Sequence, residues 1–511
     1  MRARHYLAVD LGAESGRLML GRLQGGRLTL QEVCRFANVP VRQGRSLTWN
    51  FKALLHGVRD GLRQAGALGI PLDGLSVTAW GVDYVLFDHR DRVMRPVFHY
   101  RDLRSQRGMA RVHAQASPDQ IFAESGIQFM SLNTIYQLAA ETPARRRRAR
   151  RVLLIADAVA FLLSGRPCAE ESAASTTALY NPRLRSWSRP LMRVVGWSPA
   201  QLGRVVPSGH RLGPLQAQFA GPGGPLVEVL ASCSHDTACA VAAVPAGRPA
   251  NWAYLSSGTW SLLGVEVAKP VLSEACRRHN FTNEIGCGGR IRLLKNIIGL
   301  WLVQECRRAW ARRGRQLDYA TLTRLAAEAP PFVSLINPAD PRFLAPDDMP
   351  EAIAAFCRET GQPVPRGVGA FVRCALESLA LVYRRTIGEL QEVTGKPIQR
   401  LHIVGGGSRN ALLNQLTADA AGIPVLAGPE EATAAGNVLV QAVTLGHLPS
   451  LGAARGVVRR SFPIRRFQPR RSSAWRLAAT RFERWTAGPL GVDSGLGDGR
   501  GRGAPRHSSR Q

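Results

Sequence analysis

The sequence lacks the cysteine spacings that mark a metal site or a disulfide framework. Its nine cysteines form no CxxC pair, and no Cys/His spacing is typical of zinc. An odd number of cysteines in a chain of 511 residues favours reduced thiols and a cytoplasmic protein. Cys357 and Cys374 could meet in the fold, and the sequence leaves open whether they join.

Long apolar runs are also missing. The longest, Val152 to Leu163, is interrupted by Asp157 and is shorter than the roughly 20 residues that a membrane-spanning helix needs. The N-terminus reaches Asp10 too early to be a signal peptide. These absences predict a cytoplasmic protein with no membrane partner.

Lysine is scarce, so nearly all of the basic charge comes from arginine. Only four of the 67 Lys and Arg residues are lysines, and the net charge is +30. Such a charge can attract a polyanion, but the arginines are scattered apart from the run at 145–151 and the C-terminal tail. We interpret the run as a solvated helix face and predict no specific nucleic-acid partner. The alternative, contact with DNA or RNA, rests on charge alone.

No GxxxxGK[ST] motif occurs, which excludes a P-loop phosphate site. The chain instead opens with an apolar run at Tyr6–Asp10, a turn containing Gly12 and Gly16, and a second apolar run, a pattern that predicts a β-hairpin. The same pattern recurs at Ala253–Gly264. Two such hairpins in a chain too long for one core predict two related domains that face each other across a nucleotide. Backbone N–H groups of these turns could cradle phosphates.

Asp10 ends the first of these apolar runs. A carboxylate at a strand end is a candidate ligand for Mg²⁺, directly or through water. The structural alternative is a plain turn, because many hairpins contain two glycines.

The central candidate site is the stretch ASCSHDTACA at 231–240. A buried strand is predicted over 225–230, and a helix of small residues follows the stretch. His235, Asp236 and Thr237 therefore lie at a strand-to-helix turn near the middle of the chain, where a cleft between two domains is expected. The structural alternative is that Asp236, flanked by small polar residues, only caps the helix.

Three further segments carry candidate binding residues. Trp80, Asp83 and Tyr84 could form a sugar-binding face, with Asp83 accepting hydroxyl hydrogen bonds, although Trp80 could equally be a core residue. The 3.6-residue periodicity over Lys295–Gln304 predicts a helix. Three glycines at 405–407 follow a buried strand and precede a helix, which is a favourable place for a nucleotide to lie against the backbone.

Taken together, these segments resemble the FGGY carbohydrate kinases. The resemblance covers about residues 6–470 and rests on many motifs in order, among them VDLGAESGRLML, TAWGVDYVLFD, SHDTACAV, YLSSGTWSLLG, NFTNEIG, LLKNIIGLW, LHIVGGGSRNALLNQL and GPEEATAAGN. It implies an α/β fold of two ribonuclease H-like domains, as in the actin-like ATPases, with the active site in the cleft between them. The expected domains are 1–245, which binds sugar and holds the catalytic aspartate, and 246–470, which binds the nucleotide. A disordered tail is expected at 487–511, because that segment is rich in Gly, Arg and Ser.

The resemblance also implies a reaction: ATP- and Mg²⁺-dependent phosphorylation of a small ketose. L-Rhamnulose, phosphorylated at its 1-hydroxyl in L-rhamnose catabolism, is the predicted substrate, and another ketose such as L-fuculose is the alternative. A non-catalytic sugar or nucleotide sensor would be expected to lack Asp10 or Asp236, and both are present. The expected assembly is a monomer or a homodimer.

Residue roles are carried over from the family motifs. Asp236 matches the catalytic base, and Asp10 matches the acid linked to the metal. The residues that match substrate contacts are Gly81, His235, Asp236 and Thr237. The residues that match nucleotide contacts are Ala13, Glu14, Ser15, Gly16, Arg17, Thr259, Asn296, Gln304 and Gly406.

Two positions depart from the family pattern. Thr78 stands where some relatives carry an acid, two residues before the tryptophan of WGVD. Glu14 occupies a position that can be Ser in relatives, and a carboxylate there would repel phosphates unless it points outward or acts through Mg²⁺. These changes affect fine substrate contacts more than the reaction class.

Overall fold

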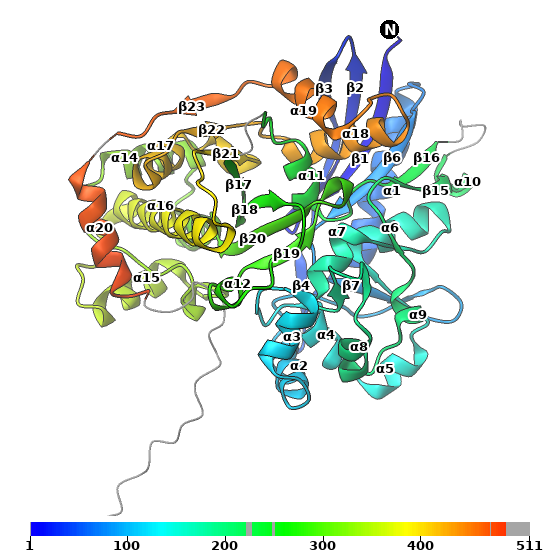
Figure 1. Ribbon diagram of the computed structural model, residues 1–511, viewed down its shortest axis with the longest axis horizontal. Helices are drawn as coiled ribbons and strands as arrows, with labels where there is room; N and C mark the ends of the chain where they lie inside the picture. The colour runs from blue at the N-terminus through cyan, green and yellow to red at the C-terminus, as the bar shows by residue number, and fades with distance from the viewer. Residues whose placement is uncertain (1, 221–226, 248–250, 471, 487–511) are drawn as a thin grey trace, which may run out of the picture.

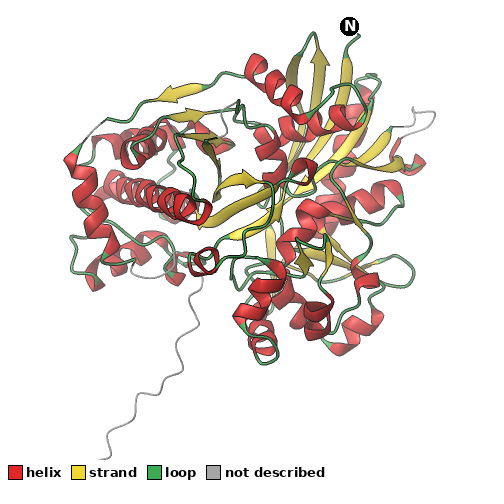
Figure 2. Cartoon of the chain, in the orientation of Figure 1, coloured by secondary structure: helices red, strands yellow, loops and turns green. Residues whose placement is uncertain are grey.

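The computed structural model describes residues 2–220, 227–247, 251–470 and 472–486. Two large β-sheets, each covered by helices, organise the chain (Figures 1 and 2). The predicted tail at 487–511 and the first two residues of the strand predicted over 225–230 lie outside the described residues.

The first sheet is built from the N-terminal part of the chain. Its hairpin strand β1 pairs antiparallel with β2 and parallel with β6, and β6 continues parallel to β16. Since parallel strands are buried on both faces, every residue of β6 is buried. The spatial order is β15 (His210–Pro214), β16 (Glu228–Ala231), β6 (Gly74–Ala79), β1 (Arg4–Leu11), β2 (Ser15–Gln24) and β3 (Arg27–Ala37).

The second sheet repeats this topology. Its hairpin strand β17 pairs antiparallel with β18 and parallel with β21, and β21 continues parallel to β22. The order is β19 (Thr282–Ile285), β20 (Ile291–Ile298), β18 (Trp260–Val267), β17 (Trp252–Ser257), β21 (Arg400–Val404), β22 (Val425–Ala427) and β23 (Arg465–Phe467). The two hairpins predicted from sequence thus each open a sheet of the same connectivity.

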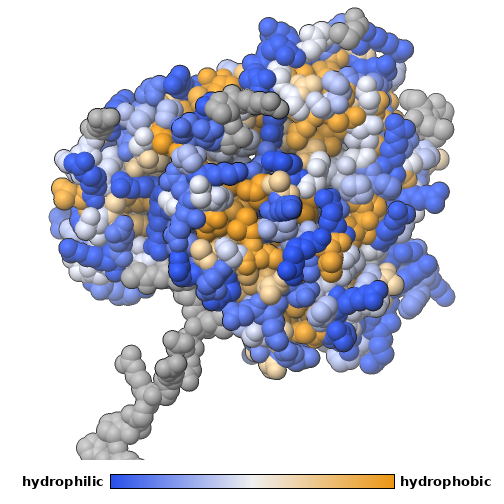
Figure 3. All heavy atoms as spheres, viewed as in Figure 1, coloured by the Kyte–Doolittle hydropathy of each residue, from blue (hydrophilic) through white to orange (hydrophobic). Residues whose placement is uncertain are grey.

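Amphipathic helices cover both sheets. On the first sheet these are α1 (Phe51–Ala67) and α6 (Ile155–Ser164). On the second, α16 (Gly367–Thr394) packs on β18 and is surrounded by α13 (Trp301–Arg312), α14 (Tyr319–Glu328), α17 (Ala411–Ala421) and α20 (Ser473–Glu483), with α15 (Met349–Glu359) beside α13. On the face seen in Figure 3, hydrophilic side chains dominate the margins and hydrophobic ones gather nearer the middle.

A smaller lobe is inserted in the N-terminal half, below the first sheet in Figure 1. It contains its own hydrophobic cluster and a short sheet of β10 (Arg151–Leu154), β7 (Tyr84–Phe87) and β8 (Val93–Met94). Its helices include α2 (Arg104–His113), α3 (Pro118–Ser125), α4 (Thr134–Ala139), α5 (Pro143–Arg148), α7 (Glu171–Ala174), α8 (Arg189–Val195) and α9 (Pro199–Leu202). Beside this lobe, β5 (Ser46–Trp49) pairs with β4 (Pro40–Gln43) and β9 (Val97–Phe98).

Two helices link the two sheets. The helix α11 (Asp236–Ala242) packs against α18 (Ala432–Thr444), and α18 also packs on β1 and β6 of the first sheet. A Cβ at Gly436 would lie 1.8 Å from the carbonyl oxygen of Cys239, so only glycine permits this approach. A helix late in the sequence therefore supports the N-terminal sheet, together with α19 (Leu451–Ser461), which lies on β3.

Three local features settle points that the sequence left open. Lys295–Ile298 is strand, not helix, because it continues the β20 ladder as far as Ile298, and the helix α13 begins only at Trp301. The solvated helix face predicted over 145–151 is only partly present: in α5, Arg147 and Arg148 are exposed, whereas Arg145 and Arg146 are half-buried, and Arg151 begins the strand β10. Cys357 and Cys374 meet as free thiols, and the hydrogen bond from Cys374 lowers the pKa of Cys357.

Candidate active site

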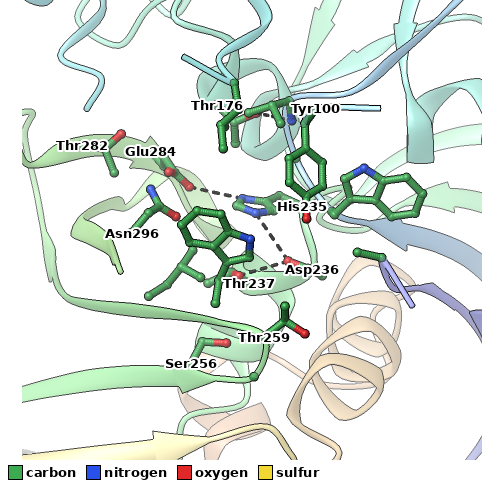
Figure 4. A pocket seen from close by; sticks show the side chains of 18 of the residues that line it. Tyr100, Thr176, His235, Asp236, Thr237, Ser256, Thr259, Thr282, Glu284 and Asn296 are labelled. Atoms are coloured by element: carbon green, nitrogen blue, oxygen red, sulfur yellow. Dashed lines mark hydrogen bonds and ion pairs between the residues drawn. The ribbon is translucent and has the colours of Figure 1, made fainter. Parts of the chain in front are cut away.

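A cavity of about 310 Å³ lies where the two halves of the chain meet. Its walls come from the strand ends of both sheets and from the inserted lobe (Figure 4). Among the residues proposed from sequence, it is lined by Ala13, Gly81, His235, Asp236, Thr237, Thr259, Asn296 and Gly406. The residues predicted to bind the sugar and several of those predicted to bind the nucleotide thus line the same cavity.

Asp236 is the first residue of α11, and its side chain, 30% exposed, faces this cavity. The carboxyl ends of β6 and β16 place it there: the backbone N–H of Ala79 donates to the carbonyl of Ser234 at 2.9 Å. Thr237 Oγ1 donates to Asp236 Oδ1 at 3.0 Å. Burial and the charge of Asp10 raise the pKa of Asp236, and His235 partly opposes this rise. A carboxylate at a helix N-terminus also gains from the helix dipole.

A buried polar network holds the segment before Asp236 in place. Ser234 Oγ donates to Asp157 Oδ1 at 2.6 Å, and the Ser234 N–H donates to Glu170 Oε2 at 2.8 Å. The His235 N–H donates to Ser172 Oγ at 3.0 Å. These hydrogen bonds fix the backbone N–H groups of Ser234 and His235, so His235 and Asp236 have little freedom to rotate away from the cavity.

Asp83 does not reach the cavity, so its predicted role as a hydroxyl acceptor is wrong. Its side chain is completely buried and accepts from Trp49 Nε1 at 2.6 Å and Trp80 Nε1 at 2.9 Å. Gln137 Nε2 and the Tyr100 N–H donate to the same carboxylate. Burial raises its pKa to about 6. Asp83 instead fixes the two indoles, and Trp80 is both a core residue and part of the cavity wall.

Gly81 lines the cavity in a tight turn that follows β6. The next residue, Val82, has a φ of 66°, and the Asp83 N–H donates to the Gly81 carbonyl at 2.9 Å. A positive φ is costly for a β-branched residue, and such strain is often found at functional sites. Tyr84 points away from the cavity and donates to Glu141 at 2.8 Å, so it does not belong to a sugar-binding face.

The opposite end of the cavity has the character of a nucleotide site. Gly405 has a φ of 84°, and a Cβ at Gly406 would meet nothing within 4 Å. A Cβ at Gly407 would lie 2.0 Å from Ser257 Oγ, so the glycine turn presses directly on the second hairpin. Thr259 lies in that hairpin's turn and lines the cavity. A planar base and ribose could therefore lie against bare backbone at Gly406.

Other predicted nucleotide and metal residues lie outside the cavity lining. These are Asp10, Glu14, Ser15, Gly16, Arg17 and Gln304. The Arg17 guanidinium lies between two carboxylates, 2.8 Å from Asp10 and 2.5 Å from Glu431. This geometry favours a structural ion pair for the Arg17 side chain over a phosphate contact. Glu14 points outward and pairs with Arg308 at 2.5 Å.

The donor set fits a magnesium ion that arrives with phosphates. Within the described ranges, no group of three or more His, Cys, Asp or Glu side chains could hold a metal on its own. Magnesium commonly uses one or two carboxylates together with waters and substrate phosphates. Asp10 offers such a carboxylate. Both of its hydrogen bonds from Arg17 go to Oδ2, and its charge helps to raise the pKa of Asp236.

Sequence reasoning missed several lining residues. Glu284 is the most important: it lies on β19, is only 3% exposed, and its Oε2 is 3.2 Å from His235 Nδ1. Burial favours the neutral form of Glu284, but Arg292 and His235 together bring its pKa below the usual value. Further lining residues for which the sequence predicts no binding role include Tyr100, Gln128, Asn133, Thr176, Trp260 and Thr282. Both Glu284 and Thr282 lie in the motif NFTNEIG, but the motif alone predicts no role for either residue.

The two halves of the chain have sheets of matching topology, and they meet around a cavity with a carboxylate at one end and a glycine turn at the other. This is the arrangement of a two-domain kinase of the actin-like ATPase fold. The model of the N-terminal domain of the FGGY family of carbohydrate kinases matches residues 5–243, and that of the C-terminal domain matches residues 253–445. The chain belongs to the FGGY family of carbohydrate kinases, a family of phosphotransferases.

Curated relatives are similar over most of their length. A rhamnulokinase of Bacteroides thetaiotaomicron is 41% identical over 487 residues, covering 94% of this chain and 99% of the relative. A rhamnulokinase of Pectobacterium carotovorum is 42% identical, covering 93% and 95%. A rhamnulokinase of Bacillus subtilis is 39% identical, covering 91% and 95%.

Solved structures show the same fold at low identity. A gluconate kinase from Lactobacillus acidophilus superposes with a TM-score of 0.75 at 12% identity and covers 95% of this chain and 96% of its own. A xylulose kinase from Rhodospirillum rubrum superposes with a TM-score of 0.74 at 19% identity, covering 95% and 98%. The predicted fold class is confirmed. Among the described residues, no helix is long and apolar enough to cross a membrane.

Proposed function

We propose that the protein transfers the γ-phosphoryl group of ATP to the 1-hydroxyl of L-rhamnulose, a step of L-rhamnose catabolism. The observation that carries the proposal is the position of Asp236, which faces a cavity shared with the glycine turn at Gly406. The choice of sugar is supported by the relatives, which are rhamnulokinases at about 40% identity over nearly the whole chain. L-Fuculose is the alternative acceptor, and no observation favours it.

Asp236 is the proposed base. Phosphoryl transfer has a loose transition state, so positioning and charge neutralisation supply most of the rate. A sugar alcohol is a poor nucleophile at neutral pH. Asp236 accepts the hydroxyl hydrogen bond, directs an oxygen lone pair at the γ-phosphorus and takes the proton late. Thr237 holds Oδ1 of the carboxylate in place.

Residues around Asp236 are proposed to bind the sugar. Gly81, His235 and Thr237 lie beside the carboxylate and line the cavity. The backbone of 13–17 and Thr259 would hold phosphates, Gly406 would pack against adenosine, and Asn296 and Gln304 would complete the nucleotide contacts. Asp10 would hold Mg²⁺, which when bound neutralises charge on the β- and γ-phosphates.

The proposal also assigns an organisation and a location to the protein. Residues 1–245 would form the sugar domain and 246–470 the nucleotide domain, in a monomer or homodimer. A cytoplasmic location is supported by the cysteines, all nine of which are free thiols. Size-exclusion chromatography with light scattering would give the assembly.

The test is a coupled ADP-release assay of the purified protein with MgATP and L-rhamnulose, beside L-fuculose, L-xylulose and L-ribulose. We expect turnover to require L-rhamnulose. In Asp236→Asn, kcat should fall by roughly two to four powers of ten, because the base is lost. Asp119→Asn is the matched control, since Asp119 is an exposed carboxylate of α3 with 72% of its side chain accessible.

Each other outcome changes a specific part of the proposal. Turnover with a different ketose only would keep the kinase and replace the sugar. Near-normal kcat in Asp236→Asn would remove Asp236 as the base. Absence of turnover with any ketose, in a folded protein that binds ATP, would favour a sensor.

A further inference from the structure

Glu284, which lines the cavity, forms a buried ion pair with Arg292. They are cross-strand partners, Glu284 on β19 and Arg292 on β20, and their side chains meet at 3.0 Å. Arg292 is completely buried, and Glu284 is 3% exposed. A buried ion pair adds little to stability compared with apolar side chains of the same size. Its presence beside the cavity therefore points to a functional reason.

The pair reaches across the boundary between the halves. His235 belongs to the N-terminal half, yet its Nδ1 lies 3.2 Å from Glu284 Oε2 and 3.1 Å from Arg292 NH2. The other ring nitrogen, Nε2, lies 3.4 Å from Asp236 Oδ1. A carboxylate, an imidazole and the catalytic carboxylate thus form a continuous chain, drawn as dashed lines in Figure 4.

Both ring nitrogens of His235 have polar neighbours. Arg292 Nε and NH2 both donate to the carbonyl of Ile285 at 3.2 Å, and NH2 also donates to Glu284 Oε2 at 3.0 Å. His235 Nδ1 lies within hydrogen-bond distance of both Glu284 Oε2 and Arg292 NH2, so it can donate to the carboxylate or accept from the guanidinium. In either case these two side chains hold the imidazole ring, and Nε2 faces Asp236 Oδ1.

We propose that Glu284, held by Arg292, is a positioning residue that acts through His235 on the catalytic base, an inference that rests on the proposed function of Asp236. Glu284 and Arg292 hold the imidazole of His235, and His235 Nε2 lies against Asp236 Oδ1. The carboxylate of Asp236 thereby keeps the orientation in which it accepts the hydrogen bond of the sugar hydroxyl. Because Glu284 comes from the C-terminal half, the base is complete only when both halves meet around the sugar.

Other charged groups face this chain and remain in place in the test. Asp10 acts on Asp236 from the first sheet, and Tyr254 of β17 lies near the Glu284–Arg292 pair. A matched control exists on the helix α16. Glu377 is also a buried carboxylate of the C-terminal half, 1% exposed, but it pairs with Arg373 at 2.6 Å and does not line the cavity.

The experiment is a double-mutant cycle on kcat with MgATP and L-rhamnulose. Glu284→Gln keeps the side-chain shape and should lower kcat by about tenfold to a hundredfold, with KM for both substrates changed by less than about threefold. Glu377→Gln should retain the wild-type kcat. If Glu284 acts through His235, adding Glu284→Gln to His235→Ala should cause no further loss of kcat. Thermal unfolding of all variants shows that they are folded.

Several outcomes would overturn the inference. Wild-type kcat in Glu284→Gln would show that Glu284 does not affect the base. Losses that multiply in the double variant would show that Glu284 acts independently of His235. A rise in KM for the sugar with unchanged kcat would make Glu284 a direct sugar contact. If Glu284→Gln fails to fold, Glu284→Gln with Arg292→Met removes the unpaired guanidinium and carries the same predictions. Wild-type protein that phosphorylates no ketose would instead refute the proposed function itself.

Discussion

The guanidinium of Arg101 lies over the ring of Trp301, with 4.0 Å between its central carbon and the ring centroid. Arg101 follows β9 in the N-terminal half, whereas Trp301 begins α13 in the C-terminal half. Arg101 Nε and NH2 are buried and have no hydrogen-bond partner among the described residues. The Trp301 ring is fixed by its Nε1–H, which donates to the Phe343 carbonyl at 3.0 Å. This cation–π contact therefore ties the two halves together beside the cavity.

Arg101→Met is expected to loosen the closed state of the cleft. A cation–π contact of this kind contributes about 0.5 to 2 kcal/mol, and closure keeps water from the phosphoryl group. We expect sugar-independent ATP hydrolysis to rise relative to sugar phosphorylation, measured as ADP release with and without the ketose. Arg107→Met, at an exposed position on α2, is the control. An unchanged ratio of the two activities would refute a role for Arg101 in closure.

Gly406 and Gly407 should respond differently to the same substitution. A Cβ at Gly406 enters open space in the cavity, whereas one at Gly407 would collide with Ser257 at 2.0 Å. Gly406→Ala should weaken ATP binding and keep the free energy of unfolding within about 0.5 kcal/mol of wild type. Gly407→Ala should lower that free energy by about 1 to 3 kcal/mol through overpacking. KM for ATP and urea unfolding measure the two effects, and equal responses would contradict the assignment of Gly406 to the nucleotide site.

The sequence predicted the repeated hairpins and the strand-to-helix turn at Asp236 because these features depend on local patterns. Apolar alternation and small turn residues recur at the same spacing in both halves. The helix predicted over Lys295–Gln304 is wrong at Lys295–Ile298, because a short apolar run carries no decisive period. Tertiary pairing with β18 decided the outcome and placed Lys295 and Asn296 on opposite faces of the sheet.

The roles of buried polar residues could not be obtained from local patterns. Asp83 follows Trp80 closely in the sequence, and its carboxylate could accept hydrogen bonds from sugar hydroxyls. In the structure, four donors from separate parts of the chain bind this carboxylate instead. Glu284 lies 49 residues from His235 along the chain, and only the meeting of two halves brings them to 3.2 Å. Side-chain roles of this kind depend on contacts that the sequence does not display.

Asp157 should make the stability of the protein depend on pH. Burial raises its pKa from 3.8 to about 7, so the folded protein holds a proton between these values that the unfolded chain has released. The stability from this group is therefore fully present below pH 3.8 and is lost as pH rises to about 7. The slope is at most about 1.4 kcal/mol per pH unit. Asp157→Asn removes this dependence, so the stability difference between variant and wild type should change across about pH 4 to 7 in urea unfolding. Parallel curves would contradict the raised pKa.

Lys295 and Glu389 form a buried pair at 2.5 Å between β20 and α16. The Lys295 side chain is completely inaccessible, and burial lowers its pKa. Glu389 also lies 3.0 Å from Arg385 and 3.6 Å from His279. Removing Lys295 therefore leaves the carboxylate with other partners, whereas removing Glu389 leaves the ammonium of Lys295 without its carboxylate partner. Glu389→Leu strands a buried ammonium and should cost about 3 to 5 kcal/mol of unfolding free energy.

Lys295→Met should cost less than Glu389→Leu, because the Glu389 carboxylate keeps Arg385 and His279 nearby. In the double variant no charge of the pair remains buried, so much of the loss in Glu389→Leu should be recovered. Urea unfolding of the two single variants and the double variant gives the coupling free energy directly. If the two losses of unfolding free energy add in the double variant, the two side chains contribute only through independent packing. If Lys295→Met loses more unfolding free energy than Glu389→Leu, the Glu389 carboxylate is stabilised by Lys295 alone.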